Sequence, residues 1–146
     1  MAIEIVRCEL SAYDSAIHII RTAVFVEEQG VPIDLEIDER DPVCAHVLAL
    51  VNNHPAGTAR LDTAHSKTGG KIGRLSILKP FRRQGLGRLI MQEIEAIGRE
   101  HQLPGLWCHA QTTAVPFYQA IGYTTNGPDF LEAGILHCKM QKSFES

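Results

Sequence analysis

Two glycines lie among three arginines in the stretch Arg82–Arg88 (RRQGLGR), directly before a long amphipathic segment. The start of a helix has backbone N–H groups without intrahelical partners, and the helix macrodipole attracts anions to that end. Gly85 and Gly87 have no β-carbons, so a phosphate could approach the amides of Gln84 through Arg88 closely. The side chains that would add positive charge are those of Arg82, Arg83 and Arg88. The stretch predicts an anion site, with a tight turn carrying solvated arginines as the alternative.

Neither of two common nucleotide-binding loops is present in this stretch. A phosphate-binding Walker loop would require Gly-Lys followed by Ser or Thr, and a dinucleotide-binding fingerprint would require a third glycine. The turn therefore favours a ligand with a nucleotide diphosphate, without specific support for ATP or NAD.

Other chemistries have weaker support from the residue spacing. Cys108 and His109 are adjacent in a short expected strand, where neighbours point to opposite faces and cannot form a nucleophile–base pair. An acyl-cysteine route through Cys108 or Cys138 remains a minor alternative. The histidines show neither HxH nor HExxH spacing, so no metal site is expected. No serine lies in a GxSxG elbow.

Hydrophobic periodicity and turn residues divide the chain into expected elements. Ser11 is expected to cap a first helix that runs to about Gln29, and the segment 30–42 is expected to be a polar, carboxylate-rich loop. A second helix follows the glycine turn and ends near His101, and Gly122 stops a short helix over 113–121. Strands are expected at 3–10, 44–51, 56–64, 71–78 and 106–110, with a hairpin-like pair within 122–140. Strands and helices alternate only in the second half, which favours a mixed sheet packed by helices.

Composition indicates an ordinary globular protein. The 146 residues are 45% apolar and 21% charged, which suits a single domain over 1–146. A net charge of −3 argues against nucleic-acid binding, and no apolar run reaches the about 18 residues of a membrane span. Four scattered cysteines and the lack of a signal-peptide pattern predict a cytoplasmic protein with reduced thiols.

Two motifs resemble the signatures of the GNAT superfamily of N-acetyltransferases. Arg82-x-x-Gly85-x-Gly87 is similar to its [R/Q]-x-x-G-x-[G/A] turn, and Val115–Tyr123 (VPFYQAIGY) is similar to its second signature. The two occur in the family order, and the resemblance covers nearly the whole chain. It implies an α/β fold (an α+β mixed sheet) of the acyl-CoA N-acyltransferase type. About six to seven strands would form a largely antiparallel N-terminal half and a splayed central strand pair, flanked by about four helices.

Further segments resemble the ElaA/YjcF-type branch of this superfamily. They are RTAVFVEEQGVP (21–32), EIDERD (36–41), AH (45–46), GTARL (57–61) and FLEAGILHCKM (130–140). The R-x-x-VF…E-x-D-x-x-D pattern also resembles acyl-homoserine-lactone synthases, which are usually longer and differ in the C-terminal half.

The resemblance implies that acetyl-CoA binds as the acetyl donor, with no metal. The turn would hold the pyrophosphate, and the strand before it would pair with the pantetheine arm through its main chain. The implied cofactor-binding residues are Leu75, Ser76, Ile77, Arg82, Arg83, Gln84, Gly85, Leu86, Gly87, Arg88, Phe117 and Tyr118. Phe117 is also expected to pack against its surroundings.

The implied reaction is direct attack of an amine on the thioester in a ternary complex. Tyr118 matches the family tyrosine that protonates the leaving thiolate, and a phenol has a suitable acidity for that step. Candidates for the group that accepts the amine's proton are Glu28, Glu132 and His137, with Asp38 and His46 behind them. Each has a solvated or structural role as its alternative, and an amine of low pKa would need no base.

The leading prediction is an N-acetyltransferase that acts on a primary amine of a small molecule or a protein. The carboxylates of 26–41 would line a mouth that favours a cationic acceptor, or would form a solvated acidic surface. The alternatives are a non-catalytic acyl-CoA-binding sensor and an acyltransferase related to lactone synthases. No nucleic-acid or membrane partner is expected, and a homodimer is left open.

Overall fold

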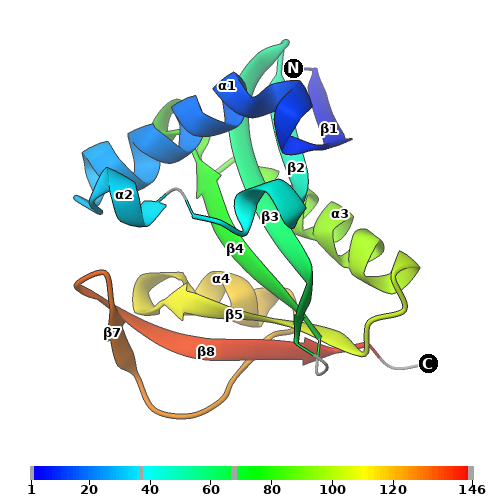
Figure 1. Ribbon diagram of the computed structural model, residues 1–146, viewed down its shortest axis with the longest axis vertical. Coiled ribbons are helices and arrows are strands. Elements are labelled where there is room, and N and C mark those ends of the chain that lie inside the picture. The colour runs from blue at the N-terminus through cyan, green and yellow to red at the C-terminus, as the bar shows by residue number, and fades with distance from the viewer. Residues whose placement is uncertain (1, 37, 67–68, 145–146) are drawn as a thin grey trace.

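A single mixed sheet organises the protein. The structure is a computed structural model that describes residues 2–36, 38–66 and 69–144. The strands lie in the order β1-β2-β3-β4-β5-β8-β6, and β7 pairs with β8 (Figure 1). Their bounds are β1 Ile3–Cys8, β2 Ala45–Val51, β3 His54–Ser66, β4 Gly69–Ile77, β5 Gly105–Gln111, β6 Thr124–Thr125, β7 Phe130–Glu132 and β8 Ile135–Ser143. The mixed sheet with a largely antiparallel N-terminal half is as predicted. Eight strands are described instead of six or seven, because the segment expected to form one hairpin-like pair contributes β6, β7 and β8.

Helices cover both faces of this sheet. Figure 1 shows α1 in front of the strands and α2 beside them at the left, with α3 and α4 behind the strands. Their bounds are α1 Leu10–Arg21, the π-helix η1 Thr22–Glu28, α2 Ile33–Glu36, α3 Leu86–Glu100 and α4 Val115–Ala120. Short 3₁₀ turns are η2 Asp41–Val43, η3 Lys79–Phe81 and η4 Thr112–Ala114.

Two expectations about these helices are wrong. Ser11 does not cap the first helix, because the helix already begins at Leu10 with Glu9 as the N-cap residue. The segment expected to be a polar loop contains α2 and η2. This segment is held against the sheet by ion pairs between its carboxylates and arginine side chains, described below. Hydrophobic periodicity carries no information about such pairs.

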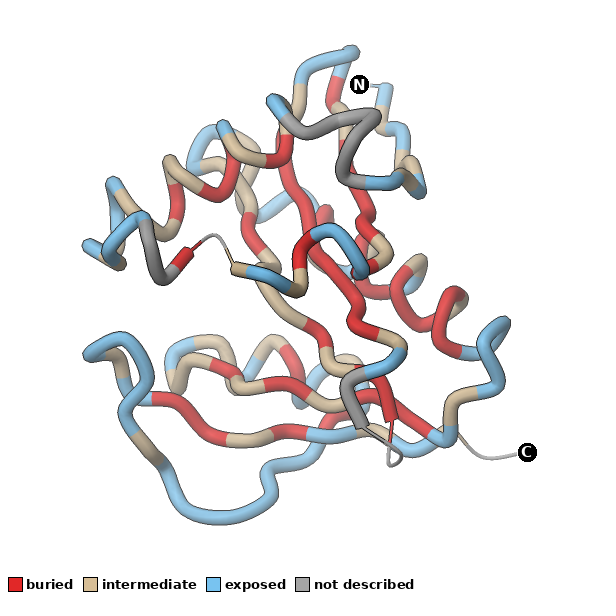
Figure 2. Tube along the Cα trace, viewed as in Figure 1, coloured by how far each residue is buried: buried red, intermediate tan, exposed pale blue. Residues whose placement is uncertain are grey.

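The main core lies between the sheet and α3. Ile90, Met91, Ile94 and Ile97 recur on one side of α3 and pack with buried residues of the central strands and β5. The buried residues concentrate on these strands and on α3 in Figure 2. Burying an aliphatic side chain of this size contributes about 1.5–3 kcal/mol, so this face anchors α3 and with it the glycine turn at its start.

Strands β4 and β5 separate after a short parallel ladder. Only Gly70–Ile72 pairs with Leu106–Cys108, whereas β4 continues to Ile77 and β5 to Gln111. Arg74 has a left-handed φ of +56°, and the register of β3 with β4 shifts between Thr58 and Arg60. A bulge of this kind bends and twists its strand. The expected splayed pair is therefore present, and the diverging part is called the split below.

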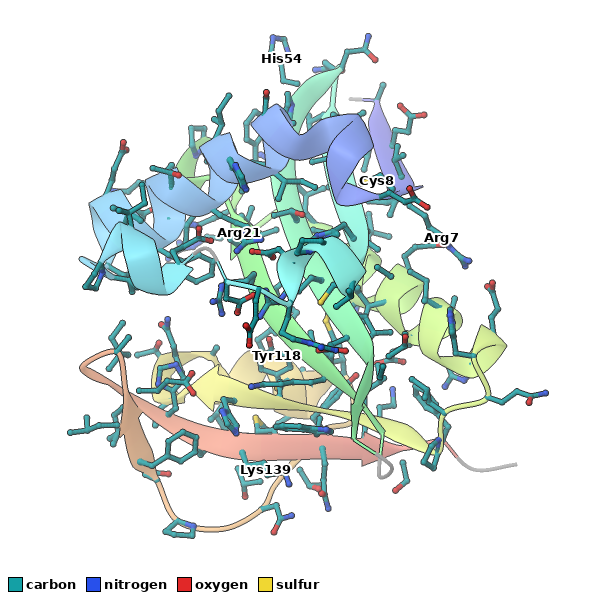
Figure 3. The ribbon with its side chains drawn as sticks, viewed as in Figure 1. Arg7, Cys8, Arg21, His54, Tyr118 and Lys139 are labelled. Atoms are coloured by element: carbon teal, nitrogen blue, oxygen red, sulfur yellow. The ribbon has the colours of Figure 1, made fainter. Side chains whose placement is uncertain are left out.

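Five buried or half-buried side chains, called the ion cluster, tie the front helices to the sheet. They are Arg21, Glu36, Asp38, Asp41 and Arg60. Arg21, which points towards the molecular centre in Figure 3, binds Glu36 and approaches Asp41 to 2.7 Å. Arg60 from β3 lies 2.8 Å from Asp41 and 2.6 Å from Asp38. The cluster fixes the α2–η2 segment against β3 and contradicts a solvated acidic surface for Glu36 and Asp41, which are 2% and 1% exposed.

The ion cluster makes the protein sensitive to acid. Burial alone would raise the pKa of Asp41, but the hydrogen bonds and charges of Arg21 and Arg60 outweigh it and hold the pKa well below its usual range. The stability gained from this carboxylate is complete above its unfolded pKa of about 3.9 and is lost as pH falls towards the folded value. Asp41→Asn should lower the free energy of unfolding at pH 7 by about 3–5 kcal/mol. It should also flatten the loss of stability below about pH 4.

Urea unfolding across the acid range measures both effects. Asp129→Asn, at an exposed position, is the matched control and should retain the wild-type pH dependence. Equal slopes below pH 4 for Asp41→Asn and the wild-type protein would contradict this account of the ion cluster.

Candidate active site

A cavity of about 1170 Å³ opens at the split. Its lining comes from β4, β5, α4, η1 and the β7–β8 hairpin, and it includes Leu75, Ser76, Ile77, Phe117 and Tyr118. Beyond Ile72, the ladder of β4 with β5 has ended. The structure therefore brings the predicted strand segment and the predicted tyrosine to one cavity that is large enough for a sizeable ligand.

The glycine turn at the start of α3 has the geometry of an anion site. Gly85 is the N-cap residue in a left-handed conformation, with φ of +80°, and no side chain of the described residues caps this end. The first intrahelical bond runs from Leu89 N–H to the Gly85 carbonyl at 3.2 Å. The amides of Leu86, Gly87 and Arg88 therefore precede the helical ladder.

Gly85 and Gly87 are needed for different reasons, and these differ in part from the expected one, which was close approach of a phosphate to the backbone. A β-carbon on Gly85 would meet nothing within 4 Å, so this position requires glycine for its backbone conformation. A β-carbon on Gly87 would lie 3.1 Å from the Phe117 ring. Gly87 thus lets α4 pack against the turn, which links the anion site to the neighbouring Tyr118.

The arginines of the turn have separate environments. Arg82 pairs with Glu28 at 2.6 and 3.1 Å, and its Nε donates to the Ile77 carbonyl at 2.9 Å. Arg82 and Arg83 line the cavity, whereas the segment from Gln84 to Arg88 lies outside the lining. The side chains of Arg83, Gln84 and Arg88 are exposed. Arg82 therefore holds the turn against η1 and β4, and the Glu28 carboxylate is paired and outside the cavity lining.

Tyr118 lies at the centre of the molecule, at the inner end of the split (Figure 3). It is 7% exposed, and its ring packs edge-on against Phe117 and Tyr123. Burial, with the charge and hydrogen bond of the Cys108 thiol, raises the pKa of Tyr118 well above its usual value. Burial raises the pKa of Cys108 to about 12, so both groups are protonated at neutral pH and Cys108 is a poor nucleophile.

A cluster of Glu132, His137 and His109 lies on the cavity wall. Glu132 Oε1 is 2.9 Å from His109 Nδ1, and Glu132 Oε2 is 3.7 Å from His137 Nε2. The Nδ1 of His137 faces the Ile135 carbonyl at 2.7 Å. The structure thus brings together Glu132 and His137, as two of the predicted candidates, and adds His109. In the sequence, His109 was considered only as a partner for Cys108. Strand alternation already placed His109 on the face opposite Cys108, and this could have indicated that it faces a different set of residues.

The remaining base candidates are occupied by other contacts. Asp38 is hydrogen-bonded by Arg60, which lowers the pKa of Asp38 despite partial burial. His46 Nε2 lies 2.9 Å from the Asp41 carbonyl, and burial lowers the pKa of this imidazole. His46 is also outside the cavity lining.

The carboxylates of Glu36, Asp38 and Asp62 line the cavity together with guanidinium groups. Asp62 pairs with Arg40 at 2.8 Å, and the Arg74 side chain reaches the Glu36 carbonyl at 3.0 Å and Asp38 at 3.3 Å. Guanidinium groups thus accompany the carboxylates of this segment, which does not support attraction of a cationic acceptor by unpaired carboxylates.

In the described part of the chain, no group of three or more His, Cys, Asp or Glu side chains could hold a metal ion. Nor is any helix of the described residues long and apolar enough to cross a bilayer.

Known proteins share both the sequence and the fold. Residues 22–144 match the sequence family described as the acetyltransferase (GNAT) domain. A Bacillus subtilis (strain 168) protein provisionally named acetyltransferase BSU40680 is 44% identical over 131 residues, which cover 87% of each chain. The uncharacterized N-acetyltransferase YjcF of the same organism is 38% identical, with 84% of this chain and 87% of YjcF covered. Escherichia coli ElaA has a TM-score of 0.86 and 25% identity, with 97% and 100% of the two chains covered. These likenesses confirm the resemblance indicated by the two sequence signatures.

The contact between Gly87 and Phe117 can be tested by stability. Gly87→Val should lower the free energy of unfolding by about 1–3 kcal/mol, because it overpacks the Phe117 ring. The same change in a Phe117→Leu background should cost less. Urea unfolding of the four proteins gives the coupling energy, and strictly additive losses would show that Gly87 and Phe117 do not constrain each other.

Proposed function

The chain belongs to the GNAT acetyltransferase family, and we propose that it transfers an acetyl group from acetyl-CoA to a primary amine. The amine belongs to a small molecule or a protein and attacks the thioester directly in a ternary complex. The observation that carries this proposal is that the split and the buried Tyr118 meet at one cavity, whose lining also includes Arg82 and Arg83. These two arginines directly precede the start of α3, which no side chain of the described residues caps.

The diphosphate of acetyl-CoA would bind the backbone amides of Gln84 through Arg88, with charge from Arg83 and Arg88. The pantetheine arm would enter the split and pair with the main chain of Leu75 through Ile77. Arg82 would act indirectly, by holding the turn against η1 through Glu28 and the Ile77 carbonyl. Phe117 would fix the distance between the turn and the thioester, because it contacts the helix start and adjoins Tyr118.

The chemical steps follow from the groups around Tyr118. Attack forms the C–N bond and a tetrahedral oxyanion, which a backbone amide near Ile77 could stabilise. Collapse breaks the C–S bond, and the thiolate takes the proton of the Tyr118 hydroxyl. Because Tyr118 remains protonated at working pH, it is always available as the donor.

Among the described residues, Asp38 and Asp62 of the cavity lining are paired with guanidinium groups, so we expect shape and hydrogen bonding to select the acceptor. The four cysteines are all free in the structure, which suits a protein in the reducing cytoplasm.

One experiment tests the function. The protein is incubated with acetyl-CoA and a panel of primary amines while free thiol is monitored, and acetyl-CoA binding is measured in parallel by calorimetry. Saturable thiol release with at least one amine is the expected result. Tight acetyl-CoA binding without turnover would replace the proposal with an acyl-CoA sensor. Turnover only with longer acyl donors and S-adenosylmethionine would indicate a lactone-synthase type of transfer.

The role of Tyr118 can be separated from its packing. Tyr118→Phe should lower kcat by roughly 10- to 1000-fold, within or near the range of general-acid contributions, with acetyl-CoA affinity little changed. Tyr123→Phe is the matched control, because the Tyr123 hydroxyl donates to Glu95 at 3.0 Å, and Tyr123 is outside the cavity lining. Steady-state kinetics on both variants checks this. Full activity of Tyr118→Phe would assign the proton to water.

A further inference from the structure

The two faces of β5 at the split carry different groups. Leu106, Cys108 and Ala110 belong to the core that packs against α3. Trp107, His109 and Gln111 alternate with them and therefore project from the opposite face. Gln111 Nε2 donates to Gln29 Oε1, next to the end of η1, at 2.7 Å, which places this second face towards η1.

His109 is the first residue of β5 beyond the ladder with β4, because Cys108 is the last residue that pairs. Its side chain lines the cavity and is 26% exposed. Tyr118, by contrast, contacts Cys108 from the core face. Tyr118 and His109 therefore approach the same end of the split from opposite faces of the sheet.

Glu132 fixes the orientation of the His109 ring. The carboxylate accepts hydrogen bonds only, so at 2.9 Å from Nδ1 it selects the neutral tautomer with the proton on Nδ1. The Nε2 atom then carries the lone pair. Phe130 and Trp107 pack around the ring, at centroid distances of 4.8 and 5.3 Å, which restricts its rotation further.

We propose that His109 is the catalytic base that deprotonates the acceptor ammonium, and that Glu132 is its positioning residue. This inference rests on the proposed function. His109 Nε2 takes one proton from R–NH₃⁺, and the neutral amine then forms the C–N bond at the thioester carbon. Tyr118 supplies the proton on the thiol, and as the amide forms, the second proton of the nitrogen returns to the Tyr118 phenolate, directly or through water. The products are the amide, coenzyme A as the thiol, and one proton released from His109.

Other titratable side chains near His109 are those of Lys139, Lys71 and His137. Lys139 lies opposite His109 in the β5–β8 register, and its Nζ lies 4.9 Å from the Trp107 ring centroid. Lys71 Nζ lies on the same ring at 5.1 Å. His137 is 7% exposed, and its Nε2 lies 3.7 Å from Glu132. His109 is thus the more accessible of the two imidazoles and has the shorter contact with the carboxylate.

The basicity of the acceptor provides a sharp kinetic test. With acetyl-CoA and butylamine, which is an ammonium at neutral pH, His109→Gln should lower kcat by roughly 100- to 10,000-fold. With hydroxylamine, which is neutral under the same conditions, the loss should be less than roughly tenfold, because no base is required. His54→Gln is the control, since His54 is exposed at the start of β3, far from Tyr118 in Figure 3, and it should match the wild-type protein.

Two further readouts separate catalysis from folding. With butylamine, kcat should fall at acidic pH in the wild-type protein, and the pH at which it falls should differ in His109→Gln. Added imidazole should restore turnover to His109→Ala. Glu132→Gln should lower kcat in the wild-type background and have little further effect in His109→Gln, because it acts through that ring. Equal losses with both amines, an unchanged pH profile or additive effects of the two substitutions would overturn the assignment.

The failure of this inference is distinguishable from the failure of the proposed function. If the wild-type protein releases thiol with butylamine and His109→Gln does so equally well, only the base assignment is overturned. If the wild-type protein acetylates no amine, both are overturned. Imidazole ¹⁵N NMR on the folded protein gives a readout without turnover. His109, identified by the loss of its signals in His109→Gln, should show the Nδ1–H tautomer, and an Nε2–H tautomer would contradict the proposal.

Discussion

The short parallel ladder between β4 and β5 is the constraint on which the rest of the structure depends. Three residues of each strand pair before the strands diverge, and the divergence leaves backbone N–H and C=O groups facing a cavity instead of a neighbouring strand. Unpaired polar groups that are removed from water cost about 1–3 kcal/mol each. A ligand with its own amides can satisfy them, whereas an apolar side chain cannot. This is the physical basis of the proposal that the pantetheine arm, an extended chain with its own amides, enters the split.

The rest of the fold keeps the two sides of the split apart at a fixed distance. On the side of β4, the left-handed Arg74 shifts the register with β3, and the ion cluster holds the α2–η2 segment against the same strands. On the side of β5, α4 packs into the glycine turn through Phe117 and Gly87. Because protein interiors are close-packed, such contacts transmit a displacement of one side to the other. The anion site and Tyr118 are thus positioned by one continuous set of contacts.

The sequence could predict the parts that depend on local pattern. The glycine turn, the helix behind it, the mixed sheet and Tyr118 follow from periodicity, backbone requirements and two short signatures. The ion cluster could not be predicted in the same way, because Arg21, Glu36 and Arg60 are far apart in the sequence and their pairing depends on the register of the sheet. The pairing of Glu28 with Arg82 and the contact of Gly87 with Phe117 were missed for the same reason. His109 was missed because it was compared with its neighbour in the sequence and not with the hairpin that faces it.

The arrangement of faces at the split suits a reaction that moves two protons in opposite senses. In the proposed reaction, the thiol would leave towards the core face, where the deeply buried Tyr118 can donate but is hard to ionise in the resting state. The amine would arrive from the face of η1, where the partly exposed His109–Glu132 pair could exchange its proton with solvent. A partly exposed base can pass its proton to solvent directly, whereas a buried base cannot. Strand alternation points Cys108, which contacts Tyr118, and His109 to opposite faces of β5. The proposed acid and base would therefore approach the thioester from opposite sides.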